Sequence, residues 1–130
     1  MSAISPTCPC GSGALLDACC GRWHAGAQRL LAPDATSLMR SRYSAYALGL
    51  LEYLQATWHA STRPTALDPM PSGLQWLGLE VRQHRLISPQ EATVEFVARS
   101  KLGGKAHRLH ETSRFVRELG QWWYVDGQIH

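Results

Sequence analysis

The stretch His107-Arg108-Leu109-His110-Glu111-Thr112-Ser113-Arg114-Phe115-Val116-Arg117 alternates between two sets of side chains. Successive side chains of an extended strand point to opposite faces, so Leu109, Glu111, Ser113 and Phe115 are expected on one face. That face is partly apolar, and it carries one carboxylate. The alternation therefore predicts a strand of a sheet that buries one face against another layer.

The segments around this stretch predict further strands and the turns between them. Residues 76–81, 92–99 and 122–126 are rich in β-branched and aromatic residues and predict three more strands. Gly103-Gly104 and Gly120 are placed to turn the chain between neighbouring strands. The second half of the chain is therefore expected to form an antiparallel meander.

The first half predicts helices instead. Residues 33–36, Pro-Asp-Ala-Thr, are a helix-start signal. Apolar and aromatic residues then recur at helical spacing, which predicts one buried stripe formed by Met39, Tyr43, Tyr46 and Leu50. A second helix is expected over about residues 50–58, and the proline-containing residues 63–73 are expected to be a loop. Helices followed by a meander predict an α+β fold with the helices on one face of a curved sheet.

Length and charge limit the range of functions. The 130 residues are 45% hydrophobic and carry a net charge of +3, which fits a globular chain. The 13 Lys and Arg are spread along the sequence, which argues against a nucleic-acid partner. No apolar run is long enough for membrane insertion, and no signal peptide is indicated, so we expect a cytoplasmic protein.

All four cysteines lie in the first twenty residues, as Cys8, Cys10, Cys19 and Cys20. Two tight pairs separated by eight residues can close four thiolates around one ion. A reducing cytosol disfavours disulfides, and soft sulfur ligands in four-coordination favour zinc. The alternatives are a disulfide or four free thiols. His24 follows closely enough to replace one cysteine as a ligand, although a packing role is the simpler interpretation.

The cysteine segment resembles a known module. Cys8-Pro9-Cys10-Gly11-Ser12-Gly13 followed by Cys19-Cys20-Gly21 is similar to the SEC-C motif, the zinc-binding knuckle named for the C-terminus of the SecA preprotein translocase. The resemblance implies zinc as the cofactor. Typical copies carry lysines between the two cysteine pairs, whereas residues 14–18 here read Ala-Leu-Leu-Asp-Ala. A lysine-mediated contact with phospholipid or ribosome is therefore not implied for this chain.

The likeness extends from Cys8 to Gly127. The chain resembles the YchJ family of bacterial proteins in six stretches: Leu38-Met39-Arg40-Ser41-Arg42-Tyr43-Ser44-Ala45-Tyr46, Thr57-Trp58-His59, Trp76-Leu77-Gly78-Leu79, Phe96-Val97-Ala98-Arg99, Glu111-Thr112-Ser113-Arg114-Phe115 and Trp122-Trp123-Tyr124-Val125-Asp126-Gly127. The resemblance implies a SEC-C-like zinc knuckle, assigned to residues 1–26. It also implies a nuclear transport factor 2-like, cystatin-like cone over residues 27–130. It implies no particular reaction.

A cone fold leaves a pocket at its open end, where a small-molecule ligand can bind. The residues expected to line it are Arg40, Tyr43, Trp58, Ser113 and Phe115. Glu111 shares the apolar strand face, and a buried carboxylate is normally paired. We therefore expect a structural ion pair between Glu111 and Arg40 or Arg42 in preference to a catalytic base.

Two functions of different classes are compatible with these features. The favoured one is a non-enzymatic adaptor or binding module whose zinc knuckle docks on a protein or ribosomal partner. Its contact surface is expected to comprise Leu15, Leu16, Arg22 and Trp23. The alternative is a small enzyme of the dehydratase or isomerase kind, in which His59, Glu111 or Asp126 moves a proton at the pocket. The absence of a nucleophile motif or phosphate loop favours the adaptor. RNA binding is the least favoured hypothesis because the charge is scattered.

Overall fold

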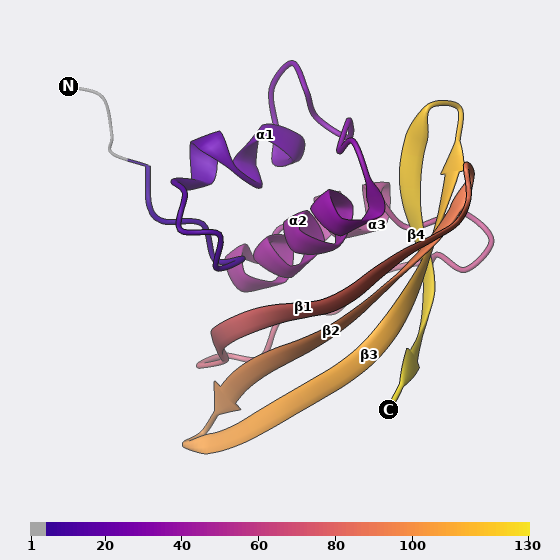
Figure 1. Ribbon diagram of the computed structural model, residues 1–130. Helices are drawn as coiled ribbons and strands as arrows, with labels where there is room; N and C mark the ends of the chain where they lie inside the picture. Colours follow the sequence, from indigo (N-terminus) through magenta and orange to yellow (C-terminus); the bar gives the residue numbers. More distant parts are fainter. Residues whose placement is uncertain (1–4) are drawn as a thin grey trace.

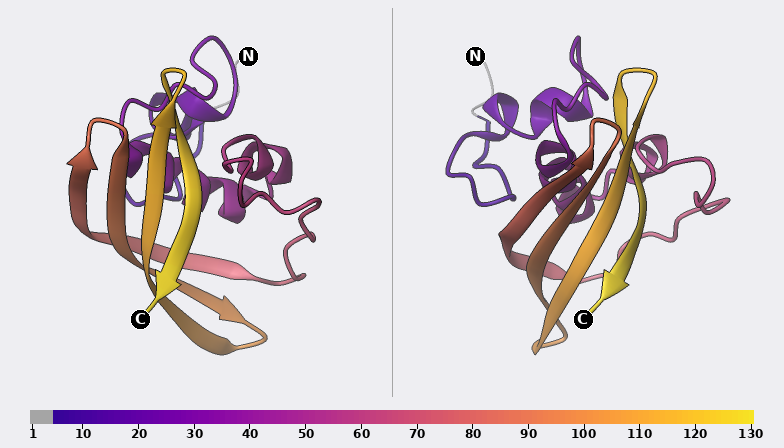
Figure 2. Two further views of the ribbon diagram at one scale, coloured as in Figure 1. Left: turned by 90° about the vertical axis from the view of Figure 1, so that its right-hand side faces the viewer. Right: turned by 45° about the vertical axis from the view of Figure 1, so that its right-hand side comes forward.

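The computed structural model describes residues 5–130 and consists of a helical layer on a four-stranded sheet (Figure 1). The helical elements are η1 (Leu16–Ala18), α1 (Gly21–His24), α2 (Ala35–Leu48) and α3 (Leu51–Ala56). The strands are β1 (Gln75–Ser88), β2 (Glu91–Leu102), β3 (Lys105–Glu118) and β4 (Gln121–Ile129). Both views of Figure 2 show the helices on one face of a strongly twisted sheet, which confirms the α+β prediction. Within residues 5–130, no helix is long and apolar enough to cross a membrane.

The sheet is a meander, with strand order β1-β2-β3-β4 and antiparallel pairing throughout. The turn between β2 and β3 uses Gly103 and Gly104, whose φ angles of 58° and 78° suit glycine. Pairing of β2 with β3 runs without a slip from Glu91 opposite Val116 to Leu102 opposite Lys105. This regular register fixes which side chains of the two strands share a face.

Several element boundaries differ from those predicted, among them the end of α2, which stops at Leu48 before Leu50 of the predicted stripe. β1 is longer than residues 76–81, because its polar second half still pairs with β2 as far as Ser88. α3 ends at Ala56, before Trp58 and His59. Trp58 instead forms a parallel bridge with Tyr124 of β4, and the backbone N–H of His59 donates to the Tyr124 carbonyl at 2.7 Å. Pairing with the sheet thus replaces the last helical turn.

Helix α2 lies at the centre of the molecule. It begins where the Asp34 side chain accepts a hydrogen bond from the Ser37 backbone N–H at 2.7 Å, as the helix-start signal predicts. It ends at Gly49, whose φ of 72° terminates the helix in the left-handed region. The α2 residues buried between the other elements are Ala35, Leu38, Met39, Ser41, Arg42, Tyr43, Ser44 and Ala45.

One core connects the cysteine segment with the rest of the chain. Cys8, Cys10, Cys20 and Trp23 belong to the same buried cluster as the apolar residues of α2, α3 and the sheet. The division between residues 26 and 27 lies in an exposed loop and stays a prediction. Residues 1–4 of the expected knuckle lie outside the described residues. The knuckle segment and the sheet layer are therefore expected to stabilise each other.

Candidate functional site

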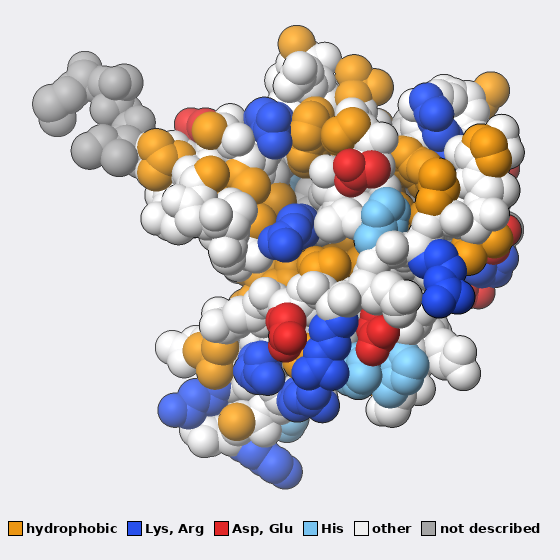
Figure 3. Space-filling view, in the orientation of Figure 1, with side chains coloured by type: hydrophobic (Ala, Val, Ile, Leu, Met, Phe, Trp, Pro, Cys, Tyr) orange, Lys and Arg blue, Asp and Glu red, His pale blue; other side chains and the backbone are white. Residues whose placement is uncertain are grey.

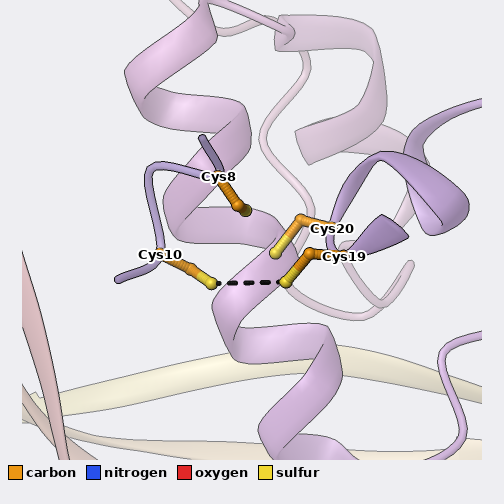
Figure 4. A group of neighbouring side chains, drawn as sticks. All are labelled: Cys8, Cys10, Cys19 and Cys20. Atoms are coloured by element: carbon orange, nitrogen blue, oxygen red, sulfur yellow. Dashed lines mark hydrogen bonds between the residues drawn. The ribbon is translucent and has the colours of Figure 1, made fainter. Parts of the chain in front are cut away.

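The four cysteine side chains converge on one point (Figure 4). Their sulfur atoms all lie within 4.8 Å of one another, and Cys10 Sγ is 3.6 Å from Cys19 Sγ. A tetrahedral centre with metal–sulfur bonds of about 2.3 Å places its sulfur atoms about 3.8 Å apart. The four cysteines therefore fit a four-coordinate metal ion with only small movements, and all of them are expected as ligands.

The local backbone explains how two cysteine pairs meet. Thr7 and Leu15 pair as an antiparallel bridge, so the segment between them closes as a loop. Within that loop Gly11 and Gly13 have φ angles of 84° and 86°, which L side chains rarely adopt. These glycines turn the first cysteine pair back towards the second, as the sequence predicts.

The thiols influence one another strongly. A hydrogen bond from the Cys20 thiol is the main cause that lowers the pKa of Cys10 to about 4. The same interaction, together with burial, raises the pKa of Cys20, and burial raises that of Cys19. The cluster thus concentrates negative charge on one sulfur while its neighbours act as donors. Thiolates are the form that binds metal, so one cation can replace the protons that these sulfurs share.

Helix α2 packs against the four-cysteine centre and forms hydrogen bonds with it. The Ser44 hydroxyl lies 3.4 Å from Cys8 Sγ and is completely buried. Arg40 Nη1 donates to the Cys10 carbonyl at 3.1 Å. On the exposed side, the Ser12 hydroxyl lies 3.1 Å from Cys19 Sγ. Hydrogen bonds of this kind orient metal ligands, so α2 and the knuckle loop form the surroundings of the site. Arg40 is consequently not a pocket residue, contrary to the prediction.

His24 is not one of the grouped ligands. Its Nε2 lies 2.8 Å from the Ser41 carbonyl, and its ring packs edge-on against Tyr53 at a centroid distance of 4.7 Å. Burial lowers the pKa of His24, which favours a neutral ring that donates to this carbonyl. His24 is therefore a packing residue between α1 and α2.

A cavity of about 330 Å³ lies between α2 and the sheet. Figure 3 shows the band of hydrophobic side chains between the helical layer and the sheet. The cavity is lined by Met39, Arg42, Tyr43, Tyr46, Met70, Trp76, Phe96, Ala98, Leu109, Glu111, Ser113, Phe115 and Tyr124. Tyr43, Ser113 and Phe115 are the expected pocket residues found there, whereas Trp58 lies outside.

The lining includes residues that the sequence analysis did not assign to a pocket. Phe96 shares one strand face with the buried residues Val94 and Ala98, and Tyr46 belongs to the predicted helical stripe. The sequence pattern could therefore have indicated that both side chains point inward. Trp76 packs edge-on against Tyr43 at 5.4 Å, and its buried Nε1 has no partner among the described residues. Met70 comes from the loop, where no periodicity could have indicated it.

Arg42 is buried, with 5% of its surface exposed, but it does not pair with Glu111. Its Nη1 donates to the Leu54 carbonyl and to Thr57 Oγ1, both at 2.7 Å. Its guanidinium also lies over the Tyr124 ring, 4.4 Å from the centroid. The predicted ion pair is wrong because the carbonyl end of α3 offers the cation a nearer acceptor.

Glu111 is held by its own strand. Its carboxylate accepts a hydrogen bond from the Ser113 hydroxyl, two residues along the same face of β3. Gly127 lies opposite Ser113 on β4, and a Cβ at Gly127 would overlap the Glu111 carboxylate. The glycine thus leaves the room that the carboxylate occupies at the pocket wall.

The other candidates for proton transfer lie outside the cavity. His59 Nε2 is 2.6 Å from a Glu118 carboxylate oxygen. Asp126 forms two hydrogen bonds of 3.1 Å with the Arg114 guanidinium, which lowers the pKa of Asp126. Neither residue lines the pocket with Glu111, so the predicted catalytic pocket near His59 and Glu111 is not assembled.

Comparison with known sequences identifies relatives along almost the whole chain. A family model described as the middle NTF2-like domain of YchJ matches residues 34–127. A UPF0225 protein of Methylibium petroleiphilum is 67% identical over 122 residues, which cover 94% of this chain and 88% of the relative. A UPF0225 protein of Bordetella pertussis is 56% identical and covers 94% of this chain and 92% of the relative.

Two solved structures share the arrangement. The solution structure of a SEC-C motif containing protein from Rhodopseudomonas palustris has a TM-score of 0.77 and 31% identity, over 96% of this chain and 98% of that one. The crystal structure of a SEC-C motif containing protein from Psychrobacter arcticus has a TM-score of 0.74 and 29% identity, over 100% of this chain and 77% of that one. The match spans both the cysteine segment and the sheet layer.

Proposed function

This chain belongs to the YchJ family, and we propose that it is a non-enzymatic adaptor in which a zinc-bound knuckle docks on the ribosome or a protein bound to it. The observation that carries the proposal is the four-cysteine centre, which is closed by four sulfur ligands and supported by α2. Four soft thiolates at tetrahedral spacing favour zinc. A closed zinc site leaves no open position for a substrate, so its role is structural.

The cone pocket supports a binding role better than catalysis. Among the described residues that line it, Glu111 is the one carboxylate and there is no histidine; the other titratable side chains are Arg42, Tyr43, Tyr46 and Tyr124. Burial raises the pKa of Tyr43 and Tyr124, which makes them weaker proton donors. General acid–base catalysis needs a proton donor and acceptor that both reach the reacting atoms. The separation of His59 and Asp126 from this cavity therefore favours a non-enzymatic protein that can still hold a small molecule.

The docking surface proposed from the sequence becomes smaller in the structure. Trp23 is only 8% exposed and belongs to the core, so it is a packing residue. Leu16 is half-buried against the same core. Leu15, at the bridge with Thr7 that closes the knuckle loop, is 49% exposed, and Arg22 of α1 is also exposed. We take Leu15 and Arg22 as the contact residues, because Leu15 is an exposed large apolar side chain and arginine is enriched among interface anchors.

Co-sedimentation with purified bacterial ribosomes tests this proposal. Leu15→Asp should reduce the bound fraction, with an apparent affinity loss of about fivefold or more, as expected for an anchor residue. Leu119→Asp is the matched control, since Leu119 is fully exposed at the turn between β3 and β4. Zinc content, measured by elemental analysis, should be unchanged in both variants. Equal binding of the two variants, or no binding of the wild-type protein, would contradict knuckle docking.

A further inference from the structure

The end of the β2–β3 hairpin carries an unusual concentration of charge. Residues 99–109 contain Arg99, Lys101, Lys105 and Arg108 and no acidic residue. We call these four side chains the basic hairpin end. In the rest of the chain ten acidic residues outnumber nine basic ones, so the net positive charge comes from this segment. Figure 1 shows the hairpin turn at one extreme end of the sheet, and Figure 3 shows Lys and Arg side chains gathered there.

Two of these cations face each other across the strands. Ala98 and Leu109 line the pocket, so their neighbours Arg99 and Arg108 point to the outer face of the sheet. Arg99 pairs directly with Arg108 in the register, and Gly78 of β1 lies on its other side without a side chain. Like charges in directly opposite positions repel each other. The sequence therefore accepts a local cost at this position.

Two other cations of the same sheet are neutralised. Arg82 lies 3.5 Å from a Glu80 carboxylate oxygen, and Arg114 pairs with Asp126 at 3.1 Å. Arg85 and Arg117, at the opposite end of the sheet, form no ion pair among the described residues. Within residues 5–130 no side chain of the basic hairpin end forms an ion pair. A group of exposed cations without acidic neighbours is available to an anionic partner.

Protection of an exposed sheet edge against pairing with other chains explains only two of the four cations of the basic hairpin end. Residues 105–109 of β3 lie beyond the end of β4, and lysines on such an edge discourage pairing with other chains. That role can account for Lys105 and Arg108. It does not account for Arg99 and Lys101, because β2 is an inner strand flanked by β1 and β3.

We propose that the basic hairpin end binds the phosphate backbone of a nucleic-acid double helix. Arg99 and Lys101 lie two residues apart on the outer face of β2, about 7 Å along the strand, so this row of cations can contact successive phosphates from outside, without entering a groove. The Gly103-Gly104 tip offers no side chain for insertion into a bilayer. Contacts made by these cations to phosphates carry no sequence information, so we expect binding without a sequence preference. The inference does not depend on knuckle docking.

Fluorescence anisotropy with a fluorescein-labelled 20-base-pair RNA duplex, and with the DNA duplex of the same sequence, tests the proposal on the full chain. Four phosphate contacts predict a log–log salt dependence with a slope of about −3 to −4. The double variant Arg99→Gln/Arg108→Gln should make the slope shallower by about two, and at 0.1 M salt it should weaken binding roughly 50-fold. The double variant Arg85→Gln/Arg117→Gln is the matched control. Both of its arginines are exposed on the same sheet at the opposite end, and it should retain wild-type affinity within about threefold.

An NMR titration of the wild-type protein gives a readout that needs no variant. Addition of the RNA duplex should shift the backbone amide signals of residues 99–109 and leave those of the knuckle in place. The proposal is overturned if both double variants lose affinity equally, or if the shifts lie elsewhere. It is also overturned if the protein binds vesicles containing phosphatidylglycerol but neither duplex. Because the probes are naked nucleic acids, these outcomes are independent of ribosome docking through Leu15.

Discussion

Arg42 shows what a buried cation can do without a carboxylate partner. Its guanidinium joins α2 to the end of α3 through the Leu54 carbonyl and Thr57 Oγ1, and two aromatic rings cover its faces. Burial lowers its pKa, but arginine stays protonated over the physiological range. The residue therefore ties α2 to the end of α3, and it also forms part of the pocket wall.

Replacing this residue should destabilise the protein measurably. Arg42→Met leaves the buried Leu54 carbonyl and Thr57 hydroxyl without their donor, which should cost about 2 kcal/mol in the free energy of unfolding. Arg40→Met is the comparison, because Arg40 is only half-buried and makes one hydrogen bond to the Cys10 carbonyl. It should cost less than about 1 kcal/mol. Urea denaturation measures both, and an Arg42→Met variant as stable as the wild type would exclude this role.

The ion pair of Asp126 with Arg114 predicts a small pH dependence. Arg114 lowers the pKa of Asp126 in the folded state, so the pair stabilises the protein above the ordinary pKa of 3.8. This contribution is lost as the pH falls through the folded-state pKa. Asp126→Asn should therefore cost up to about 0.5 kcal/mol at pH 7, since both side chains are exposed, and nothing near pH 2. Urea melts at both pH values measure the difference, with Asp68→Asn, an exposed aspartate without an ion pair, expected to show none.

At the scale of elements, α2 connects every other part of the molecule. Its residues contact the knuckle through Ser44, line the pocket through Tyr43 and reach α3 through Arg42. Substitutions that destabilise the start of this helix should therefore affect the structure of both the cysteine centre and the cavity.

The helix start offers two positions, two residues apart, with opposite expectations. Asp34→Ala removes the cap on the Ser37 N–H and should cost about 1 kcal/mol. Thr36→Ala removes a buried hydroxyl that has no hydrogen-bond partner among the described residues, so it should be neutral or slightly stabilising. Thermal unfolding followed by circular dichroism distinguishes them, and a larger loss for Thr36→Ala would refute this assignment of the cap.

The same elements show what a sequence can and cannot predict here. The helix start at Asp34 and the alternation around Phe115 are local signals, and the structure confirms both. The cysteine spacing likewise predicts the group that converges. The partners of Arg40 and Arg42 were harder to predict. Residues two apart on a helix point about 200° apart, and the sequence does not say which helix face meets which neighbouring element. The end of α3 was also missed, since it depends on pairing with Tyr124, which is distant in the sequence.

At the scale of the molecule, the four-cysteine centre belongs to the main core. Cys8, Cys10 and Cys20 are buried together with the apolar side chains of α2 and the sheet. A structural metal contributes its binding energy to folding. Loss of the metal should consequently weaken the whole chain and not the knuckle alone.

Metal removal tests this coupling. Incubation with a chelator under reducing conditions should lower the melting temperature by about 10 °C or more and retain a single transition. Hydrogen exchange should speed up in β2 and β3 as well as around the cysteines. A Cys8→Ser variant should behave like the chelated protein. A melt in which the sheet signal is unaffected by chelation would show that the knuckle is energetically separate.

The strand order of the sheet also has a kinetic consequence. Each strand pairs with the one that precedes it in the chain, so the sheet can form through successive hairpins, each of which closes a short loop. The bridge between Trp58 and Tyr124 is different, because it closes a long loop and carries the entropy cost of doing so. During synthesis the knuckle and the helices leave the ribosome before β4 exists. Strands β1 to β3 can cover most of the α2 face before then, and the part of the pocket wall that Tyr124 supplies is completed last.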